Sequence, residues 1–262
     1  MAIPTLLNPF EQARLARRLA GSVPAAAAGW ATADSLLDRH SRRHRDKIAI
    51  AYLDERITYG RLRERSDQFA GYFLSQGVRR GDRVAIDIDN RPEFLYAFHG
   101  LQRIGAVAAL INTKLRGQPL AHVIQAANPK LVVIGGEHAD VVEQLLADIA
   151  ELHPKRVVVL EEVPGASPLP DGIESINDAI DAQPTDRLTS ERAAARDHSS
   201  YIYTSGTTGL PKAAIISQQK FAMSGALGGH IMHRINPGEL IYVTLPLFHS
   251  SALMLGWASA LA

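Results

Sequence analysis

Short apolar runs rich in β-branched residues alternate with longer stretches of helical periodicity along most of the chain. This alternation is typical of α/β proteins, in which helices cover both faces of a mostly parallel sheet. Strands are predicted at 48–52, 84–88, 107–111, 131–134, 157–160, 200–203, 214–216 and 240–244. Helices are predicted at 34–44, 59–76, 92–104, 119–127, 139–152, 176–182 and 219–232. We therefore predict an α/β fold with a mostly parallel, doubly wound sheet.

Capping residues mark the ends of two of these helices. Thr58 stands where the N-cap of the helix at 59–76 is expected, and Gly77 stands where that helix should end. Ser217 is placed to cap the helix that follows it. The runs at 200–203 and 214–216 flank a turn rich in glycine and hydroxyl residues, so they predict a strand–loop–strand hairpin.

The chain divides into four predicted segments. Residues 1–30 form a lead-in that lacks the continuous apolar core of a secretory signal. A loosely docked segment is favoured there, with an amphipathic interfacial helix over 9–20 as the alternative. An α/β layer is predicted at 31–184 and a polar linker at 185–197. Residues 198–262 are predicted to hold the hairpin and the incomplete start of a second α/β layer.

The stretch from 240 to 262 carries no Asp, Glu, Lys or Arg, which superficially suits a membrane span. Pro246, His249 and two serines interrupt it. We therefore predict two buried core elements instead, a strand at 240–244 and an apolar helix that begins near Ser251.

Composition excludes several classes of function. The chain of 262 residues has 28 Lys and Arg against 27 Asp and Glu, and this near balance argues against nucleic acid as a partner. The absence of cysteine removes disulfides, thiolate nucleophiles and cysteine-ligated zinc. It also fits a reducing compartment, so we expect a cytoplasmic protein, with membrane association left open.

The turn at 204–209 carries the strongest chemical signal. The turn consists of Thr204, Ser205, Gly206, Thr207, Thr208 and Gly209, and Lys212 follows it after two intervening residues. Backbone N–H groups without side-chain obstruction, several hydroxyls and one ammonium group suit a polyphosphate. The spacing is not that of a Walker A loop. The alternative is an ordinary hairpin loop or linker.

Other polar clusters favour structural roles. His40 and His44 lie among arginines that would repel a metal ion, so a solvated basic helix face is predicted there. His230 and His233 have no carboxylate close in sequence, which favours a structural role. No metal site is predicted.

Asp87 and Asp89 share one side of a predicted strand. A pair of carboxylates can perform acid–base chemistry, but solvation at the strand end is the preferred interpretation. No G-x-S-x-G sequence is present, so a serine hydrolase is not expected.

The sequence TSGTTGLPK at 204–212 resembles the phosphate-binding signature of the adenylate-forming superfamily, which includes acyl-CoA synthetases, peptide-synthetase adenylation domains and luciferases. The similarity extends over about residues 31–262 and is greatest to the long-chain and very-long-chain acyl-CoA synthetases, including the fatty-acid transport protein branch. Ala213 stands where many members have glycine. Further segments that carry the resemblance are TYGRL at 58–62, GDRVAI at 81–86, AFHGL at 97–101 and LPLFHSS at 245–251.

The resemblance implies a fatty acid:CoA ligase. Such an enzyme joins a fatty acid to AMP at the expense of ATP, and coenzyme A then takes the acyl group. Residues 204–209 and Lys212 would hold the β- and γ-phosphates, with Thr207 and Thr208 as hydroxyl donors and Mg²⁺ as the accompanying ion. His249 is expected to border the carboxylate pocket and orient the acyl group.

The resemblance also implies that parts are missing. The Tyr-Gly-x-Thr-Glu segment, the ribose-binding aspartate, the hinge and the small C-terminal domain of this family are not found. We therefore expect a truncated chain, inactive or weakly active alone, with apolar surface exposed at 253–261. The alternative is a non-catalytic protein that binds a nucleotide or an acyl group or acts as a scaffold, or one half of a split enzyme with a separate C-terminal half. Peripheral membrane contact is left open.

Overall fold

The computed structural model describes residues 31–160, 169–185, 192–204, 210–236 and 238–262, together with Ala13 and Ala16. The amphipathic helix considered at 9–20 therefore lies almost wholly outside the described residues. Residues 186–191 of the polar segment at 185–197 do too, so the predicted domain boundary there stays a prediction.

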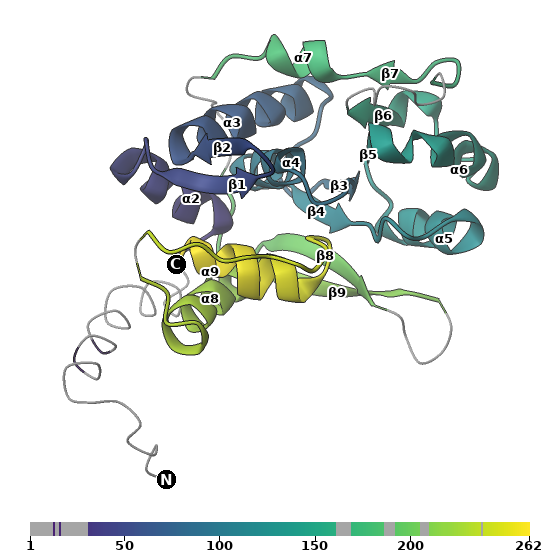
Figure 1. Ribbon diagram of the computed structural model, residues 1–262. Helices are drawn as coiled ribbons and strands as arrows, with labels where there is room; N and C mark the ends of the chain where they lie inside the picture. Colours follow the sequence, from purple (N-terminus) through teal and green to yellow (C-terminus); the bar gives the residue numbers. More distant parts are fainter. Residues whose placement is uncertain are drawn as a thin grey trace.

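A seven-stranded sheet organises the described chain, with the strand order β7-β6-β5-β3-β4-β8-β9 (Figure 1). All neighbouring strands are parallel except the last pair, β8 and β9, which is antiparallel. β1 and β2 form a separate antiparallel hairpin. The strands are β1 Ile48–Tyr52, β2 Glu55–Thr58, β3 Arg83–Asp87, β4 Val107–Leu110, β5 Leu131–Gly135, β6 Val157–Leu160, β7 Glu174–Ser175, β8 His198–Thr204 and β9 Lys212–Ser217.

Helices cover both faces of the sheet, as predicted. One face packs against α2, α3, α4 and α8, and the other packs against α5 and α6. The helices are α2 Ala33–Arg43, α3 Tyr59–Ser75, α4 Pro92–Arg103, α5 Gly117–Ala127, η1 Gly136–Val141, α6 Val142–Asp148, η2 Pro154–Arg156, α7 Asn177–Asp181, α8 Gln218–Leu227, η3 Gly228–Met232, η4 Ser251–Trp257 and α9 Ala258–Ala260.

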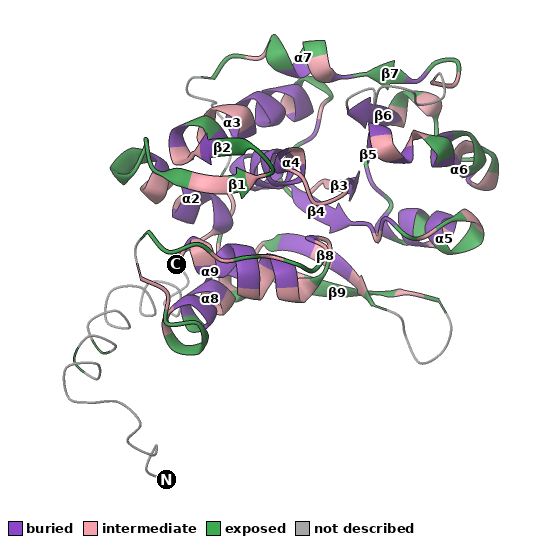
Figure 2. Ribbon diagram, in the orientation of Figure 1, coloured by how far each residue is buried: buried purple, intermediate pink, exposed green. Residues whose placement is uncertain are grey.

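Strand alternation explains how a continuous apolar run fills both layers. In β3, Val84 and Ile86 face the larger core, whereas Ala85 faces the layer of α5 and α6. Figure 2 shows the resulting buried interior along the central strands. The doubly wound α/β fold predicted from the sequence is therefore confirmed.

The predicted capping residues act as expected. The Thr58 hydroxyl accepts a hydrogen bond from the backbone N–H of Arg61, and Ser217 accepts one from Lys220. Gly77 follows the end of α3 with a φ of 76°, a conformation that glycine adopts without strain. These local signals fixed helix starts and ends to within a residue or two.

The predicted strand at 240–244 is wrong. The segment has no regular secondary structure, and its Leu240 and Tyr242 side chains are 70% and 91% exposed. An apolar run forms a strand only when a sheet edge is available for its backbone hydrogen bonds, and no described strand pairs with it. Val243 packs against Gly256 of η4 instead.

The expectation of exposed apolar surface at 253–261 is also wrong. Leu253, Trp257 and Leu261 are buried, because η4 and α9 pack against α8 and the larger core. The buried apolar helix predicted to begin near Ser251 is confirmed. None of the described helices has both the length and the apolarity needed to cross a bilayer.

A buried ion-pair network joins the three helices α2, α3 and α4. Arg63 of α3 lies 2.6 Å from Asp34 of α2 and 3.0 Å from Asp67 of its own helix. Arg103 of α4 lies 3.6 Å from Asp34 and 3.3 Å from Asp67. All four side chains are nearly inaccessible to solvent, so each charge depends on its partners.

Candidate functional site

The carboxyl ends of the parallel strands bring the candidate residues to one edge of the sheet. β3, β4, β5 and β8 run in the same direction, so the segments that follow them meet at that edge. Ligands of open α/β sheets bind outside the carboxyl ends of the strands. Thr204 ends β8 at this edge, and the phosphate-binding signature follows it directly.

The signature is held by an antiparallel hairpin, which confirms the predicted strand–loop–strand arrangement. Thr204 at the end of β8 is paired with Lys212 at the start of β9, so the two ends of the loop lie opposite each other. Both side chains are exposed and therefore accessible to a ligand. Ser205, Gly206, Thr207, Thr208 and Gly209 lie outside the described residues, and their predicted roles stay predictions.

A relay of buried amide groups fixes the base of this hairpin. Gln218, the first residue of α8, donates to the side-chain oxygen of Gln102 over 2.6 Å and accepts from the backbone N–H of Ala33 over 3.0 Å. Gln102 of α4 donates to the backbone carbonyl of Ser199 in β8. Neither glutamine could be singled out from the sequence, because isolated amides carry no spacing signal.

Asn90 ties the segment that contains His249 to the end of β3. Its side-chain nitrogen donates to the carbonyl of Leu245, and its side-chain oxygen accepts from the backbone N–H of Leu247. His249 is exposed, and its Nδ1 accepts from the backbone N–H of Ser251 at the start of η4. A role for His249 beside an acyl pocket stays a prediction.

His99 of α4 is completely buried and accepts a hydrogen bond from the Trp257 indole N–H at 2.8 Å. Burial lowers the pKa of His99 to about 3. The imidazole therefore stays neutral at physiological pH and fixes η4 against α4.

The low pKa of His99 predicts an acid-sensitive contribution to stability. An unfolded histidine titrates near 6.5. Between pH 6.5 and pH 3, the folded state therefore binds fewer protons than the unfolded state. The free energy of unfolding should therefore decline over this range by up to about 1.4 kcal/mol per pH unit from this group. His99→Gln, which can still accept from Trp257 but does not titrate, should flatten this decline in urea-unfolding experiments.

The exposed His153 offers a matched control for that experiment. His153→Gln should leave the pH dependence unchanged. An equal slope in His99→Gln and the wild-type protein would contradict the assignment.

The basic helix face around His40 is less solvated than predicted. His40 stacks on Tyr59 with ring centroids 5.0 Å apart, and its Nε2 lies 3.1 Å from the carbonyl oxygen of Leu261. Burial lowers the pKa of His40. The sequence pattern showed the surrounding arginines but not α9, which covers His40 from the far end of the chain. His44 and His233 are exposed.

The prediction that Asp87 is solvated at the end of β3 is wrong. Its side chain is only 2% exposed, and burial raises its pKa to about 6. Asp89 is half-buried and accepts a hydrogen bond from the Thr113 hydroxyl at 2.7 Å. Asp87 is buried because β5 lies next to β3, so η1, which follows β5, covers the end of β3.

Known proteins are similar to this chain in sequence and fold. The sequence profile of the AMP-binding enzyme family matches residues 37–262. Long-chain fatty acid transport protein 6 of Mus musculus is 34% identical over 224 residues, which are 83% of this chain and 34% of that protein. The medium/long-chain-fatty-acid–CoA ligase FadD6 of Mycobacterium tuberculosis is 26% identical, over 88% of this chain and 36% of that protein.

Solved structures agree with this assignment. ATP-bound MatB from Rhodopseudomonas palustris matches with a TM-score of 0.71 and 26% identity, over 87% of this chain and 43% of that one. An anthranilate CoA ligase, AuaEII, in complex with anthranoyl-AMP has the same fold, with a TM-score of 0.78. The chain belongs to the AMP-binding enzyme family. It spans about a third of the length of the curated relatives it matches.

Proposed function

We propose that the chain supplies the ATP-binding part of a fatty acid:CoA ligase. The observation that carries the proposal is the β8–β9 hairpin, which presents Thr204 and Lys212 at the carboxyl edge of the sheet. The match to the AMP-binding enzyme family over residues 37–262 supports it. The names of the relatives, which include fatty acid transport proteins and a fatty-acid–CoA ligase, favour a fatty acid as the acid substrate.

In the proposed reaction, a carboxylate oxygen of the fatty acid attacks the α-phosphorus of ATP and pyrophosphate leaves. The thiol of coenzyme A then attacks the acyl carbon, and AMP leaves. Catalysis of this kind depends on positioning and on stabilisation of phosphate charge. Thr204, residues 205–209 and Lys212 would hold the β- and γ-phosphates together with Mg²⁺. His249 would orient the acyl group.

The stable base of the hairpin suits this role. The buried amide relay from Gln102 and Gln218 fixes β8 and α8 relative to the core, so the loop ends keep their position when a phosphate binds. A loop on a fixed base loses less conformational entropy on binding than one on a mobile base.

We further propose that this chain turns over slowly or not at all when alone, because it corresponds to about a third of its relatives' length. The division at 31–184, 185–197 and 198–262 belongs to the same proposal, with the remainder of the second layer supplied by a C-terminal part. Peripheral membrane contact and a cytoplasmic location also remain proposals.

The test combines nucleotide binding with pyrophosphate exchange. Isothermal titration should detect ATP binding to the chain, whereas incorporation of labelled pyrophosphate into ATP with a panel of fatty acids should be absent or weak. Failure to bind ATP would contradict the ligase assignment, and rapid exchange would contradict the inactivity of the chain alone.

A scaffold function is the second candidate. It would retain the fold, with or without binding of a nucleotide or an acyl group, and would have lost turnover. Any pyrophosphate exchange that depends on Lys212 would exclude this candidate, whereas ATP binding that does not depend on Lys212 would favour it.

A further inference from the structure

A cluster of metal-ligand side chains lies at the carboxyl edge of the sheet, apart from the phosphate hairpin. β3 and β5 are neighbours, but the chain leaves β3 through α4 on one face and leaves β5 through η1 and α6 on the other. Adjacent strands whose connections leave on opposite faces open a crevice, and this is where doubly wound sheets bind ligands. β8 stands two strands from β3, about 10 Å away.

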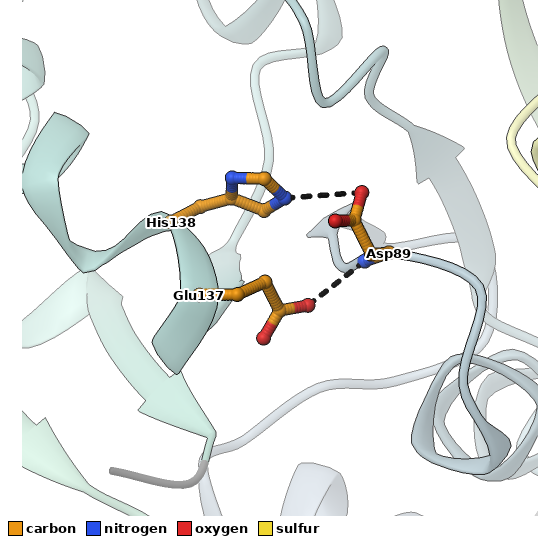
Figure 3. Close-up of side chains that lie close together, drawn as sticks. All are labelled: Asp89, Glu137 and His138. Atoms are coloured by element: carbon orange, nitrogen blue, oxygen red, sulfur yellow. Dashed lines mark hydrogen bonds and ion pairs between the residues drawn. The ribbon is translucent and has the colours of Figure 1, made fainter. Parts of the chain in front are cut away.

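Three side chains converge in this crevice. Asp89 follows β3, and Glu137 and His138 belong to η1 after β5. One ligand atom from each lies within 4.8 Å of the others. Figure 3 shows the His138 ring and the Asp89 carboxylate facing each other, with His138 Nε2 3.2 Å from Asp89 Oδ1. Glu137 Oε1 accepts from the backbone N–H of Asp89 at 2.9 Å, so its side chain turns into the same space.

Buried groups in the cluster lack hydrogen-bond partners among the described residues. His138 is only 5% exposed, yet its Nδ1 has no such partner, and its Nε2 contacts only Asp89 Oδ1. The contact of Nε2 with Asp89 is an ion pair only when the imidazole is protonated. Asp87 is buried with its Oδ1 unpartnered, and strand alternation directs it to the face that η1 covers. Buried polar groups without partners are rare and point to a ligand.

The charge around the crevice favours a cation. Asp87, Asp89 and Glu137 contribute three carboxylates. Arg91 lies 3.3 Å from Glu137 Oε2. Arg116 lies 3.7 Å from Asp140, a carboxylate outside the cluster. Lys114 also acts on Asp89. With Asp140 included, four carboxylates face the three basic groups Arg91, Lys114 and Arg116, and Arg91 leaves Glu137 Oε1 directed at the cluster.

Partners outside the cluster hold the prospective ligands in place. The Thr113 hydroxyl donates to Asp89 Oδ1, and Arg91 contacts the second oxygen of Glu137. Metal sites commonly have such outer hydrogen bonds, which orient the ligands.

We propose that Asp89, Glu137 and His138 bind one divalent transition-metal ion, with Zn²⁺ as the best match. Zinc accepts both imidazole nitrogen and carboxylate oxygen as donors, and open zinc sites have three protein ligands. Tetrahedral ligand atoms at ordinary zinc distances lie about 3.4 Å apart. Side-chain rotations that move the three ligand atoms by about 1 Å would therefore bring them to the spacing that zinc requires. Three protein ligands leave a fourth position for water or an anionic ligand.

Metal titration of the untagged full chain tests the proposal. Zn²⁺ should bind with a stoichiometry of one per chain, Co²⁺ should give the visible absorption bands of a low-symmetry site, and Mg²⁺ should bind far more weakly. Glu137→Gln, Asp89→Asn and His138→Gln should each weaken Zn²⁺ binding about tenfold or more. Glu137→Gln is the decisive variant, because Glu137 is only half-buried and the change preserves its shape.

Exposed residues nearby provide matched controls. Glu143→Gln and His153→Gln should leave the affinity unchanged, since both side chains are exposed and lie outside the cluster. Circular dichroism without metal verifies that each variant is folded. No stoichiometric binding, equal affinity in folded Glu137→Gln, or loss of binding in a His230→Gln/His233→Gln variant would overturn the proposal.

Discussion

Replacing Arg63 with methionine is expected to lower the free energy of unfolding by about 3–5 kcal/mol. Arg63 bridges Asp34 and Asp67 in the buried ion-pair network, at 2.6 and 3.0 Å. Without it, Arg103 alone would face both carboxylates across longer contacts. Removal of one partner leaves a buried charge uncompensated, which costs far more than the intact pair contributes.

Urea unfolding followed by circular dichroism measures this loss. Arg61→Met on the same helix is the control, because Arg61 is exposed and its contact with Glu64 is 3.9 Å long. Its effect should stay within about 0.5 kcal/mol. Adding Asp34→Asn to Arg63→Met leaves one carboxylate, Asp67, opposite Arg103 and should recover part of the loss. A loss in Arg63→Met no larger than that in Arg61→Met would show that the network is not stabilising.

Replacing Lys212 with methionine is expected to weaken ATP binding about 5- to 1000-fold. One ammonium group about 4 Å from one phosphate charge is worth about 1 kcal/mol in bulk water and about 4 kcal/mol at an effective dielectric of 20. Lys212 is exposed without ligand, so the result depends on how much water the bound triphosphate displaces. Higher salt should reduce the difference between the two proteins.

Lys220 provides the control for this experiment. It is also exposed, and it lies in the first turn of α8, just after β9. Lys220→Met should bind ATP as the wild-type chain does, because its Nζ lies near the carbonyl of Ile215 and not at the loop. Equal losses in both variants would indicate a general effect of charge and would contradict a specific role for Lys212.

Periodicity and capping predicted most of the fold, because both depend on residues close in sequence. The central strands are apolar on both faces, and Thr58 and Ser217 cap helices through local hydrogen bonds. The short strands β2 and β7 were missed, since β2 is half charged and β7 is two exposed residues long. Their pairing depends on neighbours and not on their own pattern.

The errors came from contacts between distant segments. Residues 240–244 have the composition of a strand, but no described strand pairs with them. The sequence around Asp87 predicts a solvated strand end, but the crossover connection places His138 beside it. The sequence around His40 predicts a surface residue, but Leu261 contacts it. The sequence predicts the residues of the phosphate hairpin, whereas the cluster of Asp89, Glu137 and His138 requires the topology.

Lysine labelling with and without ATP tests the central claim most directly. The chain would be treated with an amine-reactive acetylating reagent, and modification at each lysine would be quantified by mass spectrometry. The account predicts that ATP and pyrophosphate protect Lys212, whereas the exposed Lys155 and Lys220 react at unchanged rates. Unchanged labelling of Lys212 at saturating ATP would contradict binding of the triphosphate by this hairpin.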